Sequence, residues 1–306
     1  SCWRLNEDKN EFERGLNLDE LENILEDCKK LNVKKIDLTG GGEPFFREDI
    51  FEIISLVKDY GFEASLTTNS TLLDRDKIEK IASVGLDEIL FSIDGTKEIN
   101  DTLRGEGVFE SVMESSKLLR RLDADIFSGY STVISDKNLT ELSKVINLAD
   151  KNGMDYVNFS VMNVWDSNKQ LALKKKKSGA IRESLNQAKE TEMNSDVDTN
   201  IDKIIRHGVF ARDPPEFCFA PWKMAFINAS GEVMACCTLA SYYKNLLGNV
   251  KEKDFYSIWT GEKLERFRHQ MKEQNFPEKC KRCLPDFIEE YNKLYGELKS
   301  KYSFKF

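Results

Sequence analysis

The sequence predicts an α/β fold built on a parallel sheet, followed by a smaller cysteine-rich domain. Between about residues 19 and 165, short β-rich segments alternate with longer amphipathic segments, which is typical of consecutive strand–helix units. The length of 306 residues favours one large domain joined to a smaller one. Five of the seven cysteines follow residue 217, which indicates that the two parts differ in function.

The expected strands are short segments rich in β-branched and aromatic residues. They are residues 35–39, 63–69, 88–94, 126–133 and 156–162. The expected helices carry apolar residues at three- and four-residue spacing, and they are residues 18–31, 48–60, 74–84, 109–122 and 139–152. Asp19, with Glu22 three residues later, predicts a capping box at the first helix.

Changes in composition predict the domain boundaries. Residues 1–170 form the expected sheet domain, residues 171–212 a linker or helical bridge, and residues 213–306 the cysteine-rich domain with a C-terminal helix. Within the bridge, the lysine run 174–177 and the polar run 190–202 are interpreted as solvated surface, with a charged partner site as the alternative.

Charge and hydropathy narrow the class of protein. The net charge of −8 is spread along the chain, so nothing indicates a nucleic-acid or membrane-surface protein. No apolar run reaches the roughly 18 to 20 residues that a bilayer requires, and we expect a cytoplasmic protein. An odd number of cysteines, seven, in a chain with ample core favours metal or cluster ligation over a disulfide scaffold.

A glycine-rich loop follows the first expected strand, with the sequence T-G-G-G-E-P at residues 39–44. Its glycines permit a sharp turn that brings backbone amides close to a ligand, and Glu43 supplies a carboxylate. A phosphate-binding loop is the rival interpretation. That loop requires a following Gly-Lys-Ser/Thr, which the sequence lacks.

Three further motifs follow later strands: T-T-N-S at residues 67–70, S-I-D-G at 92–95 and L-R-G-E-G-V-F at 103–109. Together with the G-G-E-P loop, they resemble the radical S-adenosylmethionine (SAM) superfamily. The resemblance implies a partial (β/α)6 TIM-like barrel and reductive cleavage of SAM to a 5′-deoxyadenosyl radical. It implies that Gly41, Gly42 and Glu43 hold the amine of SAM. It also implies that Ser92 contacts the ribose or carboxylate region and that Arg104 binds the carboxylate.

Two residues are weaker candidates for the same pocket. Asn69 and Thr132 follow or end expected strands, and ordinary strand-end hydrogen bonding is the alternative for both. The resemblance also explains Cys2, which stands about where the third cysteine of the family's C-x-x-x-C-x-x-C loop is expected. It implies that Cys2 is one ligand of a 4Fe–4S cluster and that the first strand and two other ligands precede Ser1. Three thiolates leave one iron open to SAM.

The C-terminal part contains four candidate metal ligands: Cys218, Cys236, Cys280 and Cys283. An expected hairpin turn at residues 228–231 would bring the first two together. Four thiolates suit either zinc or a 4Fe–4S cluster, and spacing alone does not choose. The order C-x-x-P-W, G-x-x-x-x-C, G-N-V, I-W and C-x-x-C resembles a SPASM or twitch domain, which implies one auxiliary 4Fe–4S cluster.

Two cysteines stand outside these sets. Cys237 is interpreted as a buried thiol, with an alternative ligand or reactive group as the other hypothesis. Cys28 shares the apolar face of the first expected helix and is expected in the core.

The resemblance predicts a cytoplasmic, oxygen-sensitive radical SAM enzyme that abstracts a hydrogen atom from its substrate. A peptide or protein substrate is the favoured hypothesis, and a small cofactor or natural-product precursor is the alternative. Flavodoxin or ferredoxin is the expected reducing partner, and no membrane or nucleic-acid partner is expected. No catalytic donor or acceptor can be singled out. The non-radical alternatives are a zinc-stabilised binding module and a barrel enzyme with a phosphorylated substrate.

Overall fold

The computed structural model describes residues 15–39, 41–162, 164, 166–210, 217–240, 247–277 and 280. These residues form two compact units. Residues 33–209 belong to the first unit, and residues 15–32 with the described residues from 210 onward belong to the second.

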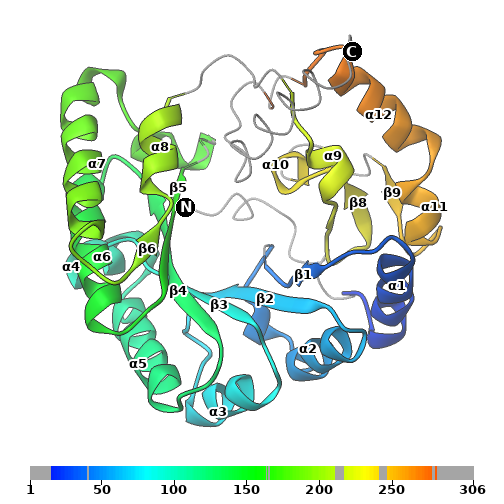
Figure 1. Cartoon of the computed structure of the whole chain (residues 1–306), viewed down its shortest axis with the longest axis horizontal. Helices are drawn as coiled ribbons and strands as arrows, with labels where there is room; N and C mark the ends of the chain where they lie inside the picture. The colour runs from blue at the N-terminus through cyan, green and yellow to red at the C-terminus, as the bar shows by residue number, and fades with distance from the viewer. Residues whose placement is uncertain are drawn as a thin grey trace. The chain divides into compact units, whose positions relative to one another are not determined.

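A six-stranded parallel sheet forms the centre of the first unit (Figure 1). Its strands are paired in chain order: β1 (Lys35–Asp37), β2 (Glu63–Thr68), β3 (Glu88–Ser92), β4 (Phe127–Ile134), β5 (Tyr156–Val161) and β6 (Asp198–Thr199). The first five confirm the expected strands within one to two residues at most ends, whereas β6 was not predicted. Parallel neighbours in chain order, joined by helices, are the arrangement of a partial (β/α)6 barrel.

Helices connect these strands. Those expected from the sequence are α2 (Ile50–Asp59), α3 (Arg75–Ser83), α5 (Val108–Arg121) and α6 (Leu142–Lys151). The helix α4 (Lys97–Arg104) was not predicted, whereas α7 (Ser178–Glu192) and α8 (Ile201–His207) lie within the segment expected as a linker or helical bridge. Short 3-10 turns occur at η3 (Pro44–Phe46), η4 (Leu139–Glu141), η5 (Asp166–Leu171) and η6 (Lys175–Lys177).

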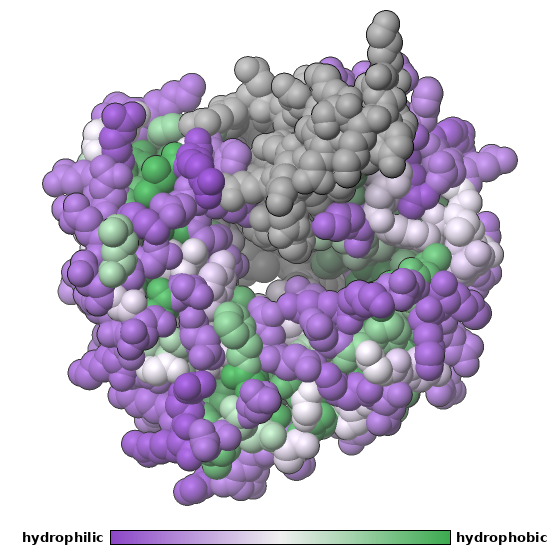
Figure 2. Space-filling view, viewed as in Figure 1, coloured by the Kyte–Doolittle hydropathy of each residue, from purple (hydrophilic) through white to green (hydrophobic). Residues whose placement is uncertain are grey.

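The helices cover one face of the sheet, and the core of the first unit lies between that face and the helices (Figure 1). Phe91 and Phe159 on the strands and Ile54 and Ile81 on the helices are at most 1% exposed. Burial of an aromatic or aliphatic side chain of this size stabilises the fold by about 1.5–3 kcal/mol. The outer surfaces of the helices are mostly hydrophilic (Figure 2).

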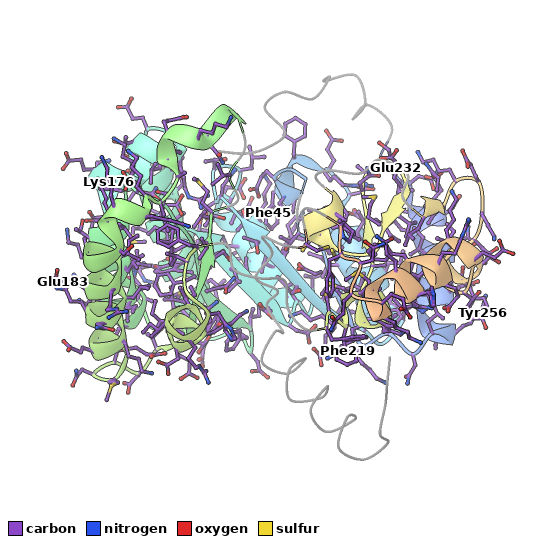
Figure 3. The ribbon with its side chains drawn as sticks, turned by 90° about the horizontal axis from the view of Figure 1, so that it is seen from above. Phe45, Lys176, Glu183, Phe219, Glu232 and Tyr256 are labelled. Carbon is purple, nitrogen blue, oxygen red and sulfur yellow. The ribbon has the colours of Figure 1, made fainter. Side chains whose placement is uncertain are left out.

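Residues 171–207 lie in the expected linker or helical bridge, and the structure makes them part of the sheet unit. They contain α7, β6 and α8, and β6 extends the sheet by pairing with β5. The apolar positions of α7 were hidden among polar residues: Ile181, Leu185 and Ala188 are buried at helical spacing, while Lys176 and Glu183 lie on the outer side (Figure 3). The segment therefore belongs to the first unit.

The lysine run 174–177 precedes α7, and two of its lysines form ion pairs with Asp136. Lys177 contacts the Asp136 carboxylate at 2.8 Å, and Lys174 contacts it at 3.7 Å. Hydrogen bonding from Lys177 is the main cause of the lowered pKa of Asp136.

The second unit begins with α1 (Leu18–Lys30), whose cap differs from the predicted one. Asn17 is the N-cap and Glu20 completes the capping box, with Glu20 N–H donating to Asn17 Oδ1 at 2.8 Å. The prediction from Asp19 and Glu22 was wrong because Asn17 is itself a strong N-cap, which starts the helix earlier. Such a cap stabilises a helix by about 1 kcal/mol.

The rest of the second unit contains a small antiparallel sheet and short helices. Its elements are α9 (Ala220–Lys223), β7 (Phe226–Ile227), β8 (Glu232–Met234), α10 (Cys237–Ala240), β9 (Gly248–Asn249), α11 (Phe255–Trp259) and α12 (Glu262–Lys272). The expected hairpin is confirmed: β7 pairs with β8, and the turn between them includes Gly231 at φ 84°. Asp27 of α1 accepts a hydrogen bond from the Tyr256 N–H of α11 at 3.0 Å. None of the described helices has the length and apolar character needed to cross a bilayer.

Candidate functional site

The two faces of the large sheet differ in polarity. Side chains alternate between the faces of a strand, and the helix-covered face carries mainly buried apolar residues. The opposite face, called here the polar face, carries Asp37, Ser65, Thr67, Ser92, Ser131, Asn158 and Ser160. Parallel sheets usually read as apolar on both faces because helices cover both. A polar face therefore indicates a ligand site rather than a packing surface.

The Gly41–Glu43 loop lies at the carboxyl end of β1, beside the end of β2. Gly41 has a φ of 74°, a left-handed conformation that glycine adopts without strain. The half-buried Glu43 carboxylate is held from β2: Thr68 Oγ1 donates to its Oε1 at 2.6 Å, and Asn69 N–H donates to its Oε2 at 2.8 Å. The loop therefore holds its carboxylate in one place at the strand ends.

The electrostatics of Glu43 suit a cationic ligand. Burial raises the pKa of the Glu43 carboxyl, and the hydrogen bonds from Asn69 and Thr68 only partly oppose that rise. Among the described ion pairs, none gives Glu43 a positively charged partner. A carboxylate has about four acceptor sites, and the donors from Asn69, Thr68 and the Phe45 backbone leave part of that capacity open. An ammonium group on a ligand would supply the missing charge and hydrogen bonds, so the residues fit the amine of SAM.

The side chain of Asn69 has a local role. Its Oδ1 accepts hydrogen bonds from the backbone N–H of Thr71 at 2.9 Å and from the Thr71 hydroxyl at 2.6 Å. The backbone N–H of Asn69, and not its amide, is what contacts Glu43. Asn69 Oδ1 thus makes the local hydrogen bonds named as its alternative, and the expected contact of Asn69 with SAM stays a prediction.

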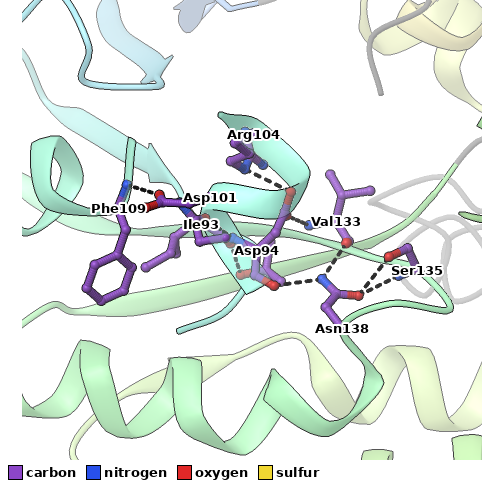
Figure 4. A network of polar contacts seen from close by, with 10 residues as sticks. Ile93, Asp94, Asp101, Arg104, Phe109, Val133, Ser135 and Asn138 are labelled. Atoms are coloured by element: carbon purple, nitrogen blue, oxygen red, sulfur yellow. Dashed lines mark hydrogen bonds and ion pairs between the residues drawn. The ribbon is translucent and has the colours of Figure 1, made fainter. Parts of the chain in front are cut away.

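A second polar cluster joins the ends of β3 and β4 (Figure 4). Asp94 is 4% exposed, and its Oδ1 accepts from Val133 N–H at 2.8 Å. Its Oδ2 lies 2.8 Å from Arg104 Nε. The buried Asn138 amide donates to the carbonyls of Asp94 and Val133, each at 2.9 Å. We call Asp94, Arg104, Thr132 and Asn138 the strand-end network.

This network gives Arg104 and Thr132 partners within the protein. The guanidinium of Arg104 is paired with Asp94, so its expected contact with the SAM carboxylate remains a prediction. The Thr132 hydroxyl is fully buried and donates to the Ile93 carbonyl at 2.7 Å. In this structure Thr132 ties β4 to the end of β3, which is the alternative named for it.

Ser92 stands on the polar face in register with two polar neighbours. It pairs with Ser131 of β4, which in turn pairs with Asn158 of β5. All three are half-buried, and neither serine side chain makes a hydrogen bond within the described part of the chain. Adjacent strands lie about 4.8 Å apart, so a single ligand can reach all three. We call Ser92, Ser131 and Asn158 the polar row.

Asp37 is another acidic residue on the polar face, at the end of β1. Although part of its side chain is exposed, desolvation by the surrounding protein raises its pKa, against hydrogen bonding from Thr39 and the charge of Lys35. Sequence reasoning missed Asp37, Ser131 and Asn158. The alternation of polar and apolar residues in Y-V-N-F-S-V at residues 156–161 was the signal that could have identified one polar face.

Three of the predicted cysteine ligands are described, in the second unit. Cys218, Cys236 and Cys280 are half-buried, and burial raises the pKa of Cys218 against a hydrogen bond from the Ala220 N–H. Cys2 and Cys283 lie outside the described residues. Within the described ranges, no group of three or more His, Cys, Asp or Glu side chains is placed to hold a metal. The full ligand sets therefore remain predictions.

The other two cysteines have different environments. Cys28 of α1 is 5% exposed and is therefore part of the core, as expected. Burial raises the pKa of its thiol to about 12. Cys237, at the start of α10, is exposed. Its interpretation as a buried thiol was wrong, because the strand β8 that precedes it ends three residues earlier and the backbone turns into α10.

Two family profiles match the chain. The radical SAM superfamily profile matches residues 2–149. The profile of the SPASM domain, an iron–sulfur cluster-binding domain, matches residues 218–284. The two matches follow the division between the strand-rich and cysteine-rich parts of the sequence.

Curated relatives and solved structures agree with these profiles. The chain is 28% identical over 88% of its length to the AdoMet-dependent heme synthase of Methanosarcina barkeri and spans 79% of that protein. It is 30% identical over 46% of its length to the Fe-coproporphyrin III synthase of the same organism, spanning 35% of it. It is 27% identical over 43% of its length to the mycofactocin maturase MftC of Mycobacterium tuberculosis, spanning 34% of it.

The fold matches that of a solved structure. SuiB of Streptococcus suis, in its complex with the precursor peptide SuiA, has a TM-score of 0.68 to this chain at 16% identity. The match covers 95% of this chain and 69% of SuiB. Together with the family profiles and the parallel six-stranded sheet, these comparisons show that the chain belongs to the radical SAM superfamily, as an enzyme that uses SAM and a 4Fe–4S cluster and carries a SPASM iron–sulfur domain.

Proposed function

We propose that this enzyme abstracts a hydrogen atom from a carboxylate-bearing tetrapyrrole precursor of a cofactor. SAM and the reduced cluster together supply a 5′-deoxyadenosyl radical, which removes a hydrogen atom from a substrate C–H bond. The residues of this chain bind and orient the two ligands: Glu43 and the glycines before it take the amine of SAM, and Ser92 takes its ribose or carboxylate region. Cys2 contributes one cluster ligand.

One observation supports this SAM site above all others. The Glu43 carboxylate is half-buried, fixed by Thr68 and Asn69, and without a cationic partner among the described residues. A buried carboxylate is costly unless a charge or hydrogen bonds compensate it. The ammonium group of SAM provides that compensation, and the fixed carboxylate in turn orients the sulfonium relative to the polar face.

The relatives support the substrate class. The heme synthase aligns with 88% of this chain, and the Fe-coproporphyrin III synthase also acts in the chemistry of iron porphyrins. This support reverses the order of the two substrate classes expected from the sequence. Ser131 and Asn158 of the polar row add hydrogen-bond donors, which suit the carboxylate side chains that such tetrapyrroles carry.

A peptide substrate is the second candidate. The mycofactocin maturase is a relative over 43% of the chain, and SuiB, whose fold this chain shares, was solved with a precursor peptide. The shorter alignment and the purely structural likeness make this support weaker than that of the heme synthase.

The remaining parts of the proposal follow from the chemistry. A flavodoxin or ferredoxin in the cytoplasm supplies the electron. Cys218, Cys236, Cys280 and Cys283 hold one auxiliary 4Fe–4S cluster in residues 213–306, and residues 1–170 carry the SAM site.

Anaerobic reconstitution of the full-length protein tests the function. We expect iron and sulfide for two 4Fe–4S clusters, and release of 5′-deoxyadenosine on addition of SAM and dithionite. Fe-coproporphyrin III should accelerate that release and change in mass, whereas precursor peptides of the SuiA and mycofactocin types should not. Acceleration by a peptide alone would replace the tetrapyrrole with the second candidate. Zinc in place of iron would remove the auxiliary cluster.

A further inference from the structure

The amide of Asn200 is locked in one orientation. Asn200 lies between β6 and α8, and its Oδ1 accepts from Phe159 N–H at 2.7 Å. Its Nδ2 donates to the Phe159 carbonyl at 2.8 Å and to Asn158 Oδ1 at 2.9 Å. Because a backbone N–H can only donate and a carbonyl can only accept, these contacts determine which end of the Asn200 amide is oxygen.

The locked amide of Asn200 determines the orientation of Asn158 in turn. Asn158 Oδ1 must be the acceptor for Asn200, so the NH2 group of Asn158 is directed away from Asn200. Asn158 is half-buried in the polar row, and its NH2 group makes no hydrogen bond within the part of the chain that the structure describes. A fixed amide donor therefore stands next to the hydroxyl of Ser131 on the face that is not covered by helices.

We propose that Asn158 recognises a carboxylate of the substrate and that Asn200 is its positioning residue. The inference rests on the proposed function, since the tetrapyrrole supplies the carboxylates. An ionised carboxylate only accepts hydrogen bonds, which complements the NH2 of Asn158 and the hydroxyl of Ser131 beside it. A substrate ammonium group would meet the NH2 of Asn158, which cannot accept from it, and an amide oxygen that already accepts one hydrogen bond from Asn200. The free end of the Asn158 amide therefore favours an acceptor group.

The direct test replaces the donor and keeps the shape. In Asn158→Asp, a carboxylate oxygen still accepts from Asn200, but the NH2 group becomes an oxygen that repels the substrate carboxylate. Hydrogen bonds to charged groups contribute about 1.5–3 kcal/mol, so affinity should fall about 10- to 100-fold. The matched control is Asn186→Asp, which makes the same charge change at an exposed position on α7.

The measurement is equilibrium dialysis of Fe-coproporphyrin III and, separately, of SAM against the anaerobically reconstituted enzyme. We expect Asn158→Asp to weaken porphyrin binding at least 10-fold more than SAM binding, and Asn186→Asp to bind both like the wild type. Equal porphyrin binding by the wild type and Asn158→Asp would overturn the inference and leave the proposed function standing. If Asn158→Asp weakened only SAM binding, Asn158 would contact SAM, and the inference would be overturned. A wild type that does not bind the porphyrin would overturn the proposed function and the inference with it.

The role of Asn200 is tested by a double-mutant cycle. Asn200→Asp can still accept from Phe159 N–H but cannot donate to Asn158, which frees the Asn158 amide to turn over. Alone it should weaken porphyrin binding about 10-fold. In the Asn158→Ala background it should add nothing, because the group that it positions is absent. Additive losses would reduce Asn200 to a structural residue, and thermal unfolding of each variant separates a binding loss from a folding loss.

Discussion

The strand-end network joins the ends of β3 and β4, and the polar row crosses β3, β4 and β5, yet the two clusters differ in how their polar atoms are used. In the network, the Asp94 carboxylate, the Asn138 amide and the Thr132 hydroxyl are buried and bonded to the protein. In the row, Ser92 and Ser131 are half-buried, and their hydroxyls make no hydrogen bond within the described residues. The network therefore stabilises the fold, whereas the hydroxyls of Ser92 and Ser131 remain available for the ligand contacts proposed above.

The comparison also teaches how motif residues should be interpreted. Arg104 belongs to a motif of the expected SAM pocket and Thr132 is a weaker candidate for it, but their partners here are Asp94 and the Ile93 carbonyl. A residue can stand in a motif because it shapes the site rather than because it contacts the ligand. Unused hydrogen-bonding capacity on an uncovered face is the more direct indication of contact.

Removing the centre of the network should produce the largest effect. Asp94→Ala deletes the acceptor of Val133 N–H and leaves the partly buried Arg104 without its carboxylate. Breaking a buried ion pair on one side costs about 3–5 kcal/mol. The free energy of unfolding, measured in urea, should fall by that amount.

The control for that loss is Asp59→Ala, which removes an exposed carboxylate at the end of α2. Its unfolding free energy should stay within about 0.5 kcal/mol of the wild type. If Asp94→Ala were as stable as this control, the network would not be a stabilising element and the contrast with the row would fail.

A smaller effect is expected for a single hydroxyl of each cluster. Thr132→Val keeps the shape of the side chain but leaves the Ile93 carbonyl without its donor, which should cost about 1–2 kcal/mol of stability. Ser131→Ala, the residue before it, should cost less than about 0.5 kcal/mol, because its hydroxyl bonds to nothing in the described protein. Equal losses of unfolding free energy in the two variants would break the comparison.

Glu43 accepts hydrogen bonds from the protein, like the residues of the network, and has no cationic partner among the described residues. The pH dependence of protein stability measures what burial of this carboxylate costs. Burial raises the pKa of Glu43 above its ordinary value of 4.5, so the folded protein holds this proton more tightly than the unfolded chain. The associated stability is present below pH 4.5 and is lost as pH rises through the raised pKa.

Glu43→Gln lacks this titration. In the ligand-free protein, the variant should gain stability relative to the wild type as pH increases from about 4.5 to 7, by less than about 1 kcal/mol. Thermal unfolding across that range checks the trend. A wild type that gains on the variant over the same interval would show that the carboxylate is not desolvated.

Much of the fold could be predicted from the sequence because its determinants are local. The strands β2 and β5 alternate polar and apolar residues, and the helices α2 and α6 have regular apolar spacing. The strand β6 was missed because two residues, Asp198 and Thr199, carry no periodicity, and they become a strand only by pairing with β5.

The candidate site was predictable only in part, for the same physical reason. The glycine loop with Glu43 is a contiguous motif. By contrast, Asn158 and Asn200 are 42 residues apart, and Arg104 meets Asp94 only because α4 returns to the end of β3. Partners brought together by tertiary folding leave no local signal, so the sequence could not distinguish residues that shape the site from residues that contact the ligand.

The central claim is that Glu43, fixed by Thr68 and Asn69 and lacking a cationic partner among the described residues, holds the amine of SAM. The most direct measurement is the dissociation constant of SAM for the reconstituted enzyme, compared between Glu43→Gln and the exposed control Glu52→Gln on α2. Loss of a charge-assisted hydrogen bond predicts that Glu43→Gln binds SAM about 10- to 100-fold more weakly while the control matches the wild type. Equal SAM affinity in the two variants would contradict the account.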